Sequence, residues 1–185
     1  MPDESERKYL FVAIDRASRW VYLDIMPNKR ADSAKKFLKD LIEAFPGKIT
    51  KILSDNGKEF TDRYCRSGER KPTGKHVFDG ACMENNIEHR LTKPRMPQTN
   101  GMVERFNGRI ADILKTTRFR SSADLKKTLA YYLHSYNNTI AQRALKHKTP
   151  IQALAGFLCQ PNLTGPDSYP LFKPTIISID VLNMI

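Results

Sequence analysis

The chain has 185 residues, of which 40% are hydrophobic and 28% charged, as is ordinary for one soluble domain with a sizeable core. No apolar run approaches the ~18 residues of a membrane helix, and no signal-like segment opens the chain, so we expect a protein that neither spans a membrane nor is exported. The formal net charge of +11 favours a polyanionic partner, although basic surfaces also occur in proteins that bind none.

The three cysteines, Cys65, Cys82 and Cys159, form no C-x-x-C pair, and the four histidines are dispersed. Zinc sites built from cysteine and histidine need close, regular spacing, so this pattern argues against one. Isolated cysteines are typical of reduced thiols, and we therefore expect a cytoplasmic protein.

The first part of the chain predicts a strand hairpin followed by a helix. Residues 1–8 are polar and are expected to form an N-terminal tail. Apolar runs at 9–14 and 20–25 predict two strands, and the short interval between them predicts that they pair antiparallel. Residues 31–45 combine charged residues with apolar ones at helical spacing, which predicts an amphipathic helix with one buried face.

A third strand is predicted at 48–54, where β-branched residues follow a Pro-Gly break, and Asp55 stands directly after it. The next residues, Asn56 and Gly57, favour a sharp turn. Open α/β sheets bind ligands at the carboxyl ends of their strands, which makes Asp55 a candidate binding or catalytic acid. The alternative interpretation is that Asp-Asn-Gly forms a plain turn.

Residues 62–75 are charged, contain glycine and proline and have little periodicity, which predicts an exposed loop. Several of its cations could contact phosphate, although a solvated loop is the simpler interpretation. A short helix at 78–83 and a short strand at 88–91 are predicted to follow.

The segment 92–109 predicts a loop that leads into a second amphipathic helix. Two prolines disfavour helix at its start, and apolar residues then recur at three- and four-residue spacing, with Asn100 as a plausible N-cap. Glu104 would lie in the first turn, where an acid commonly complements the helix dipole. Placed beside Asp55, it would instead complete a two-carboxylate site suited to Mg²⁺ or Mn²⁺.

The remainder predicts one more helix and a tail. Ser121 or Ser122, with Asp124, can begin a helix whose leucine and tyrosine stripe we assign to the core. The tail, residues 156–185, contains several prolines and finishes in an apolar, β-prone run. It could be an added strand, an oligomer contact or the altered end of a decayed element, and it stays unassigned.

Three blocks carry a resemblance to a known family: LSDNGKEF at 53–60, IEHRLTKP at 87–94 and PQTNGMVERFNGRI at 97–110. They closely resemble the retroviral-integrase-like DDE transposases of bacterial insertion sequences, with similarity from about residue 9 to about residue 154. The resemblance implies an α/β, RNase H-like core, which is a mixed sheet flanked by helices. It also implies metal-dependent cleavage and joining of transposon-end DNA by a homo-oligomer in the bacterial cytoplasm.

This resemblance divides the chain into a tail (1–8), a catalytic core (9–155) with an inserted loop (62–75), and an unassigned tail (156–185). It implies that Asp55 and Glu104 are catalytic and bind the metal, Mg²⁺ or Mn²⁺. The candidate DNA contacts are Asn56, Lys58, Lys93, Arg95, Gln98, Asn100, Arg105, Asn107 and Arg109. No helix-turn-helix is evident, so recognition of particular DNA ends would belong to another segment.

The family pattern requires a third acid, on a strand that precedes the one at 9–14. Residues 1–8 do not resemble a strand, so we expect an N-terminally truncated core that lacks its first strand and first catalytic Asp. Asp15 is the alternative ligand, although it matches a residue that usually caps the hairpin turn. Activity is therefore doubtful, and a catalytically inactive DNA-binding or oligomerisation remnant is the main alternative. An RNase H-type nuclease is disfavoured by the PQTNG..ER block.

Overall fold

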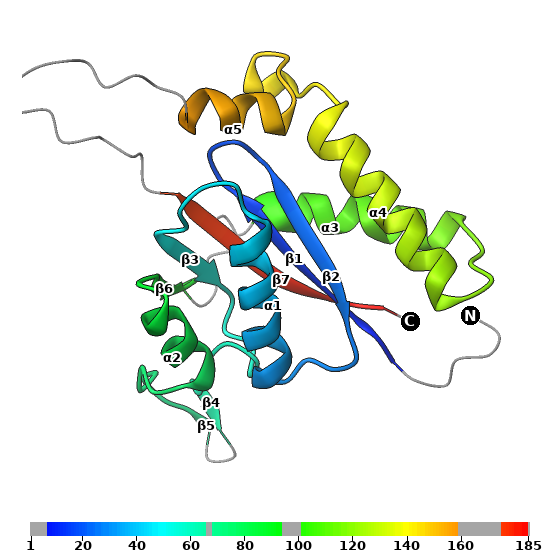
Figure 1. Cartoon of the computed structure of the whole chain (residues 1–185). Coiled ribbons are helices and arrows are strands. Elements are labelled where there is room, and N and C mark those ends of the chain that lie inside the picture. The colour runs from blue at the N-terminus through cyan, green and yellow to red at the C-terminus, as the bar shows by residue number, and fades with distance from the viewer. Residues whose placement is uncertain (1–6, 66–67, 94–100, 159–174, 185) are drawn as a thin grey trace, which may run out of the picture.

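The computed structural model describes residues 7–65, 68–93, 101–158 and 175–184, and its centre is a mixed sheet with helices on both faces (Figure 1). The sheet order is β2-β1-β7-β3-β6. Its strands are β1 (Tyr9–Asp15), β2 (Val21–Met26), β3 (Lys51–Ser54), β6 (Glu88–Leu91) and β7 (Ile176–Asn183). The helices are α1 (Ala31–Ala44), α2 (Val77–Glu84), α3 (Gly101–Thr116), α4 (Ser122–Asn138) and α5 (Pro150–Leu158), with a 3₁₀ turn at Arg143–Leu145. This architecture confirms the predicted α/β class.

The predicted hairpin is confirmed, since β1 and β2 pair antiparallel with Ile14 opposite Val21. Its turn explains Asp15, which is only 2% exposed. Oδ2 of Asp15 accepts hydrogen bonds from the backbone N and the Oγ of Ser18, at 2.8 and 2.6 Å. Asp15 therefore caps the turn that reverses the chain.

Strand β7 occupies the centre of the sheet, between β1 and β3. It pairs antiparallel with β1 and parallel with β3, with Ile52 opposite Ile177 and Ser54 opposite Ile179. The unassigned tail thus contributes an added strand, and the core sheet extends beyond the predicted limit at residue 155. Instead of lacking a strand beside β1, the sheet receives one from the C-terminal part of the chain.

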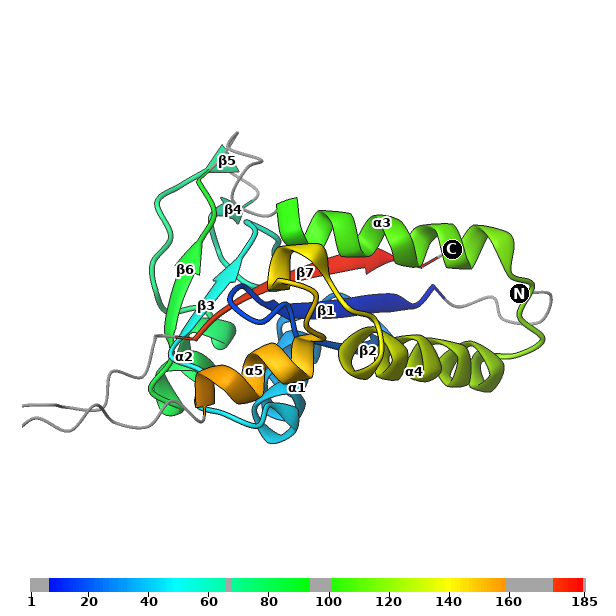
Figure 2. The same ribbon diagram turned by 90° about the horizontal axis from the view of Figure 1, so that it is seen from above.

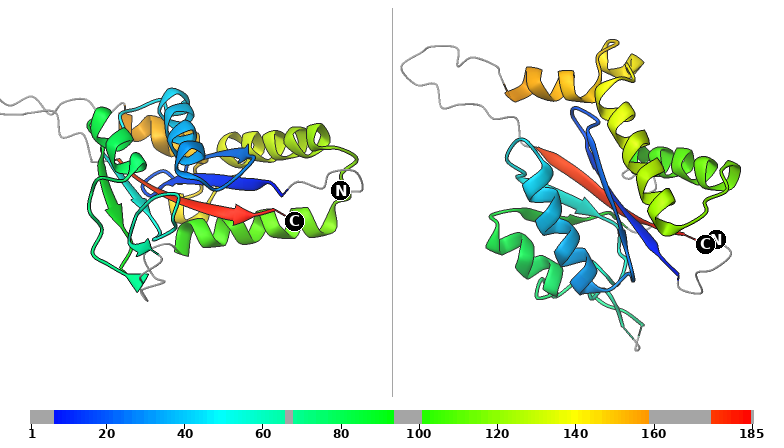
Figure 3. Two further views of the ribbon diagram at one scale, coloured as in Figure 1. Left: turned by 90° about the horizontal axis from the view of Figure 1, so that it is seen from below. Right: turned by 45° about the vertical axis from the view of Figure 1, so that its right-hand side comes forward.

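Alternate side chains of the central strands enter two apolar layers. The layer under α1 and α2 includes Phe11, Phe37, Ile52, Phe78, Ile177 and Ile179. The layer under α3 and α4 includes Leu10, Val12, Val103, Phe106, Ile110, Leu125 and Leu129. Figure 2 shows α3 running along β7, and Figure 3 shows α1 and α3 on opposite sides of the sheet. A membrane-crossing helix would need a longer apolar run than any helix of the described residues provides.

The predicted loop at 62–75 is more ordered than its composition suggested, because Asp62 ties it together. It contains a small hairpin, β4 (Tyr64–Cys65) and β5 (Gly68–Glu69). The carboxylate of Asp62 accepts bonds from Thr73 Oγ1 at 2.6 Å and from Arg70 Nη2 at 2.7 Å. The hydrogen bonds from Thr73 in particular lower the pKa of Asp62 to about 2. These partners lie eight and eleven residues from Asp62, beyond the three- and four-residue spacing that local periodicity reveals.

If β7 is a core strand, truncating its apolar side chains must destabilise the whole domain. Ile177 is fully buried, so Ile177→Ala should lower the free energy of unfolding by about 2–5 kcal/mol in urea denaturation. The matched control is Ile140→Ala, since Ile140 is 42% exposed and should change stability by less than about 0.5 kcal/mol. Equal small losses in the two variants would contradict the central placement of β7.

Candidate active site

Asp55 lies directly after β3, and its side chain also forms the turn that follows. The backbone N of Gly57 donates to Oδ1 of Asp55 at 2.9 Å, as in an Asx turn. Asn56 Nδ2 donates to the carbonyl of Thr92 at 3.0 Å, which fastens this turn to the end of β6. The turn interpretation and the binding interpretation are thus compatible, because the turn fixes where the Asp55 carboxylate stands.

A chain of side-chain contacts from Asp79 on α2 through His89 on β6 to Ser54, called here the Asp-His-Ser relay, supports the end of β3. His89 on β6 lies 2.7 Å from Ser54 Oγ through its Nε2, and 2.5 Å from Asp79 Oδ1 through its Nδ1. Burial lowers the pKa of His89, against the opposing effect of Asp79. A neutral ring that donates from Nδ1 to Asp79 and accepts from the Ser54 hydroxyl satisfies all three groups. Because Ser54 is fully buried, we assign the relay to support of Asp55 rather than to nucleophilic chemistry.

Glu59 is a further acid near Asp55 that the sequence analysis did not single out. It is buried, and a Cβ added to Gly57 would lie 2.7 Å from the Glu59 carboxyl carbon, so this carboxyl packs directly against the turn. Burial raises the pKa of Glu59, and the charge of Asp55 adds to the effect. The signal available in the sequence was its position in the Asp-Asn-Gly block, four residues after Asp55.

Glu104 lies in the first turn of α3, as predicted, with its side chain exposed. The apolar face of α3 holds the helix against the sheet through Val103 and Phe106. Asn107, predicted as a DNA contact, instead lies buried one turn beyond Glu104. Its Nδ2 donates to Oδ2 of Asp180 at 3.0 Å, so α3 is connected to the middle of β7.

Asp180 is the acid that the sequence analysis missed. Burial is the main factor that raises its pKa to about 6, and the charges of Asp55 and Glu104 add to the effect. Asp180 on β7 is therefore close enough to Asp55, after β3, and to Glu104, on α3, for their charges to act on it. The available signal was a β-prone run that includes an acid, Ile176 to Asp180, much as the third strand ends in Asp55. The local sequence pattern did not predict which strands this β-prone run would pair with.

The donors around this point suit a hard divalent cation. Carboxylate oxygens are the ligands that Mg²⁺ and Mn²⁺ prefer, and Asp55, Glu104 and Asp180 supply them. Oδ1 of Asn107 is a buried oxygen with no hydrogen-bond partner among the described residues. No three acid, histidine or cysteine side chains of the described residues are already gathered as a metal site. Glu104 is exposed, so its side chain is the one that can turn toward the strands.

The other predicted site residues divide into three groups. Lys58, Lys93, Arg105 and Arg109 are exposed. Arg105 Nε donates to the carbonyl of Gly101 at 2.8 Å, and Arg109 contacts Tyr132. Asn56 is occupied in the turn after Asp55. Arg95, Gln98 and Asn100, including the predicted N-cap, lie outside the described residues.

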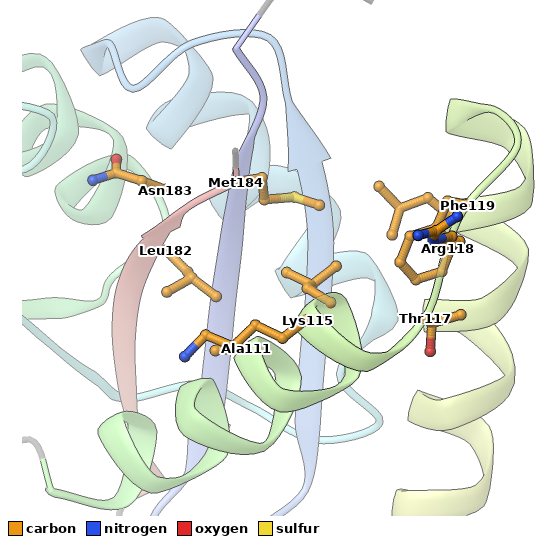
Figure 4. Close-up of a pocket in the computed structure, with 10 residues that line it drawn as sticks. Ala111, Lys115, Thr117, Arg118, Phe119, Leu182, Asn183 and Met184 are labelled. Carbon is orange, nitrogen blue, oxygen red and sulfur yellow. The ribbon is translucent and has the colours of Figure 1, made fainter. Parts of the chain in front are cut away.

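Two other features lie apart from the three acids. Asp15 pairs with Ile177, near the start of β7, whereas Asp55 follows the pair that Ser54 makes with Ile179. A pocket of about 790 Å³ opens at the far end of α3, as Figure 4 shows. Its lining includes Leu114, Lys115, Phe119, Leu182 and Met184. Neither feature belongs to the site at Asp55.

Comparison with known families places this geometry in context. The family model described as "Integrase core domain" matches residues 1–97, and a second model of the same description matches residues 85–150. Together they cover the hairpin, β3, β6, α3 and α4, with Asp55 and Glu104. Strand β7 lies beyond both matches.

Individual relatives are consistent with these family matches. The chain is 29% identical over 154 residues to the ORF3 protein of Spiroplasma virus SpV1-C74, whose name describes it as an integrase. This alignment covers 80% of the chain and 42% of the relative. A 39.2 kDa protein of insertion element IS476 from Xanthomonas euvesicatoria is 28% identical over 124 residues, covering 66% of the chain and 32% of the relative. The chain thus spans less than half the length of these relatives.

Solved structures share the fold. A chain of the simian T-cell lymphotropic virus intasome, in complex with a PP2A regulatory subunit, superposes with a TM-score of 0.61 at 22% identity, covering 87% of this chain and 52% of that one. The HTLV-2 integrase catalytic core domain with magnesium gives 0.57 at 20% identity, covering 78% and 82%. At these identities the likeness shows the fold, that of a retroviral integrase catalytic core.

The relay behind Asp55 predicts a pH dependence of stability. Because the folded state lowers the pKa of His89, the unfolded chain binds this proton more readily, and stability is lost as pH falls from above 6.5 through the folded pKa. His89→Gln removes this titrating group. The free energy of unfolding in urea should therefore differ less between pH 7.5 and pH 5.5 in this variant than in the wild type. The variant should also be less stable at pH 7.5 by about 1–3 kcal/mol, because Asp79 and Ser54 lose their partner. Equal pH differences in the two proteins would contradict the assignment.

Proposed function

From the membership of this chain in the integrase core domain family, we propose that it catalyses metal-dependent cleavage and strand transfer of transposon-end DNA. The observation that carries the proposal is that Asp55 and Glu104 lie near the same residue of β7, Asp180. Asp55 directly follows the Ser54–Ile179 pair, and Glu104 lies one helical turn before Asn107, which is hydrogen-bonded to Asp180. Open α/β sheets bind ligands outside the carboxyl ends of their strands, which is where Asp55 lies.

Asp55 and Glu104 would hold the cation in this mechanism. Divalent ions bound there would supply Lewis-acid activation of the attacking oxygen and neutralise charge at the phosphodiester. The Gly57 amide donates to the Asp55 carboxylate and orients it, while the relay holds the preceding residue, Ser54. Glu104 stands on a helix packed rigidly against the sheet, with only its own side chain left to adjust.

The exposed cations beside these acids would position the DNA. Lys58 and Lys93 flank the end of β3 and β6, and Arg105 and Arg109 follow Glu104 on α3. Contacts from such side chains to phosphate fix the register of a duplex without reading its sequence. The net charge of +11 supports a DNA partner. Self-association is a further proposal, supported by the simian T-cell lymphotropic virus intasome and by the HTLV-2 integrase catalytic core domain, whose structure is of a trimeric form.

Removing either acid should abolish the chemistry while preserving the fold. Glu104→Gln and Asp55→Asn should each reduce Mn²⁺-dependent nicking of a supercoiled plasmid at least about 100-fold, since each removes a metal ligand. Asp32→Asn is the matched control, because Asp32 is an exposed acid on α1, across the sheet from α3. Nicking that survives in Glu104→Gln would contradict the proposed mechanism. Wild-type protein that binds DNA without nicking would favour the inactive remnant.

Phosphate contacts predict how binding responds to salt. Lys58→Gln should weaken binding of a labelled DNA duplex. It should also reduce the magnitude of the slope of log K against log salt concentration by about one. Lys39→Gln serves as the control, because Lys39 is exposed on α1 and pairs with Glu43 at 4.0 Å. Fluorescence anisotropy between about 50 and 200 mM salt measures both slopes. The same slope in wild type and Lys58→Gln would remove Lys58 from the DNA interface.

A further inference from the structure

We propose that Asp180, carried into the sheet by β7, is the third carboxylate of the metal site. This inference rests on the proposed function and extends it to a residue outside both family matches, which end at residue 150. The family pattern places its third acid on a strand that precedes β1 in sequence. Here the strand between β1 and β3 follows every other element of the described fold.

The strand register places Asp180 beside Asp55. Ser54 and Ile179 are the last pair of the parallel ladder between β3 and β7, so Asp55 and Asp180 are the residues that directly follow this pair on the two neighbouring strands. Neighbouring strands lie about 4.8 Å apart, which is within the span of two carboxylates on one cation.

The two acids also share a face of the sheet. Ile52 and Ile177, which are paired, both enter the layer under α1 and α2. Side chains alternate between faces along a strand, so residues an odd number of positions further on lie on the opposite face. Asp55 and Asp180 are each three positions beyond this pair, and both therefore face α3.

Helix α3 brings Glu104 to the same point. The 3.0 Å bond from Asn107 Nδ2 to Asp180 Oδ2 fixes the helix against β7 at this position. Glu104 precedes Asn107 by three residues, and residues at this spacing lie on one side of a helix. The Glu104 side chain thus lies one helical turn from Asn107, the residue of α3 that contacts Asp180.

One observation and one electrostatic argument point to a cation rather than to a purely structural role for Asp180. Oδ1 of Asn107, next to this carboxylate, is buried without a hydrogen-bond partner among the described residues. Three carboxylates also repel one another unless a cation or a proton lies between them. A residue that only accepts bonds from Asn107 and from the Val181 backbone N could equally be an asparagine or a serine.

Asp15, the alternative third ligand from the sequence, does not fit. It stands opposite Ile177, three residues before Asp180 along β7. Its Oδ2 already accepts two hydrogen bonds from Ser18 within the hairpin turn. Its Oδ1 is also buried without a partner among the described residues, but the turn holds this carboxylate at the start of β7, away from Asp55 and Asp180.

Metal binding by the full chain tests the inference without depending on catalysis. Mn²⁺ affinity, followed by EPR of free Mn²⁺, should fall at least about tenfold in Asp180→Asn, because loss of an outer-shell partner alone costs about 10–100-fold. Asp55→Asn and Glu104→Gln should weaken binding similarly. Asp15→Asn should bind as wild type, and thermal melting verifies that each variant is folded.

A second measurement uses the wild-type chain alone. Bound Mn²⁺ should broaden the amide NMR signals of Asp55, Asp180 and Val181, and leave those of Glu69 in the small hairpin sharp. Undiminished affinity in folded Asp180→Asn, with affinity lost in Asp55→Asn, would overturn the role of Asp180 and leave the proposed function standing. Absence of Mn²⁺ binding and of nicking in wild type would overturn both.

Discussion

The pairing of β7 between β1 and β3 is the constraint on which the rest of the structure depends. It joins the antiparallel hairpin on one side to the parallel strands on the other, and without it the sheet would divide into two parts. Its Ile177 and Ile179 lie in the layer under α1 and α2, while Leu182 and the following Met184 pack in the layer under α3 and α4. The same strand carries Asp180 next to the carboxyl end of β3, which Asp55 directly follows. Stability of the fold and the third carboxylate of the proposed metal site thus depend on one element.

The site combines rigid and adjustable parts. Asp55 is fixed by its own turn, and the relay through His89 ties the preceding residue, Ser54 at the end of β3, to α2. Asp180 is fixed by Asn107 and by the backbone of its own strand. Glu104 alone remains exposed on a packed helix. In the proposed metal site, a cation would draw the movable carboxylate toward the two anchored ones, because its charge would offset their mutual repulsion.

Local pattern and family resemblance predicted much of this architecture. The hairpin, α1, β3, the helix that carries Glu104 and the serine cap of α4 all followed from apolar periodicity and capping residues. The ordered loop around Asp62 did not, because its side-chain bonds join residues eight and eleven positions apart. The position of β7 did not, because its partners are far away in sequence. The resemblance directed attention to a strand ahead of β1 for the third acid. Strand pairing is decided by the whole sheet, so a β-prone run at 176–183 could not be placed from its own residues.

The central claim is that β7 is an inner strand of the folded chain, and hydrogen–deuterium exchange tests it most directly. Amides of inner strands exchange only when the whole domain unfolds, whereas those of loose segments exchange through local opening. The account predicts that the amides of Ile177 to Asp180 exchange as slowly as those of Phe11 to Ala13 in β1. Exchange of the β7 amides as fast as that of Gly68 and Glu69, with β1 still protected, would contradict it.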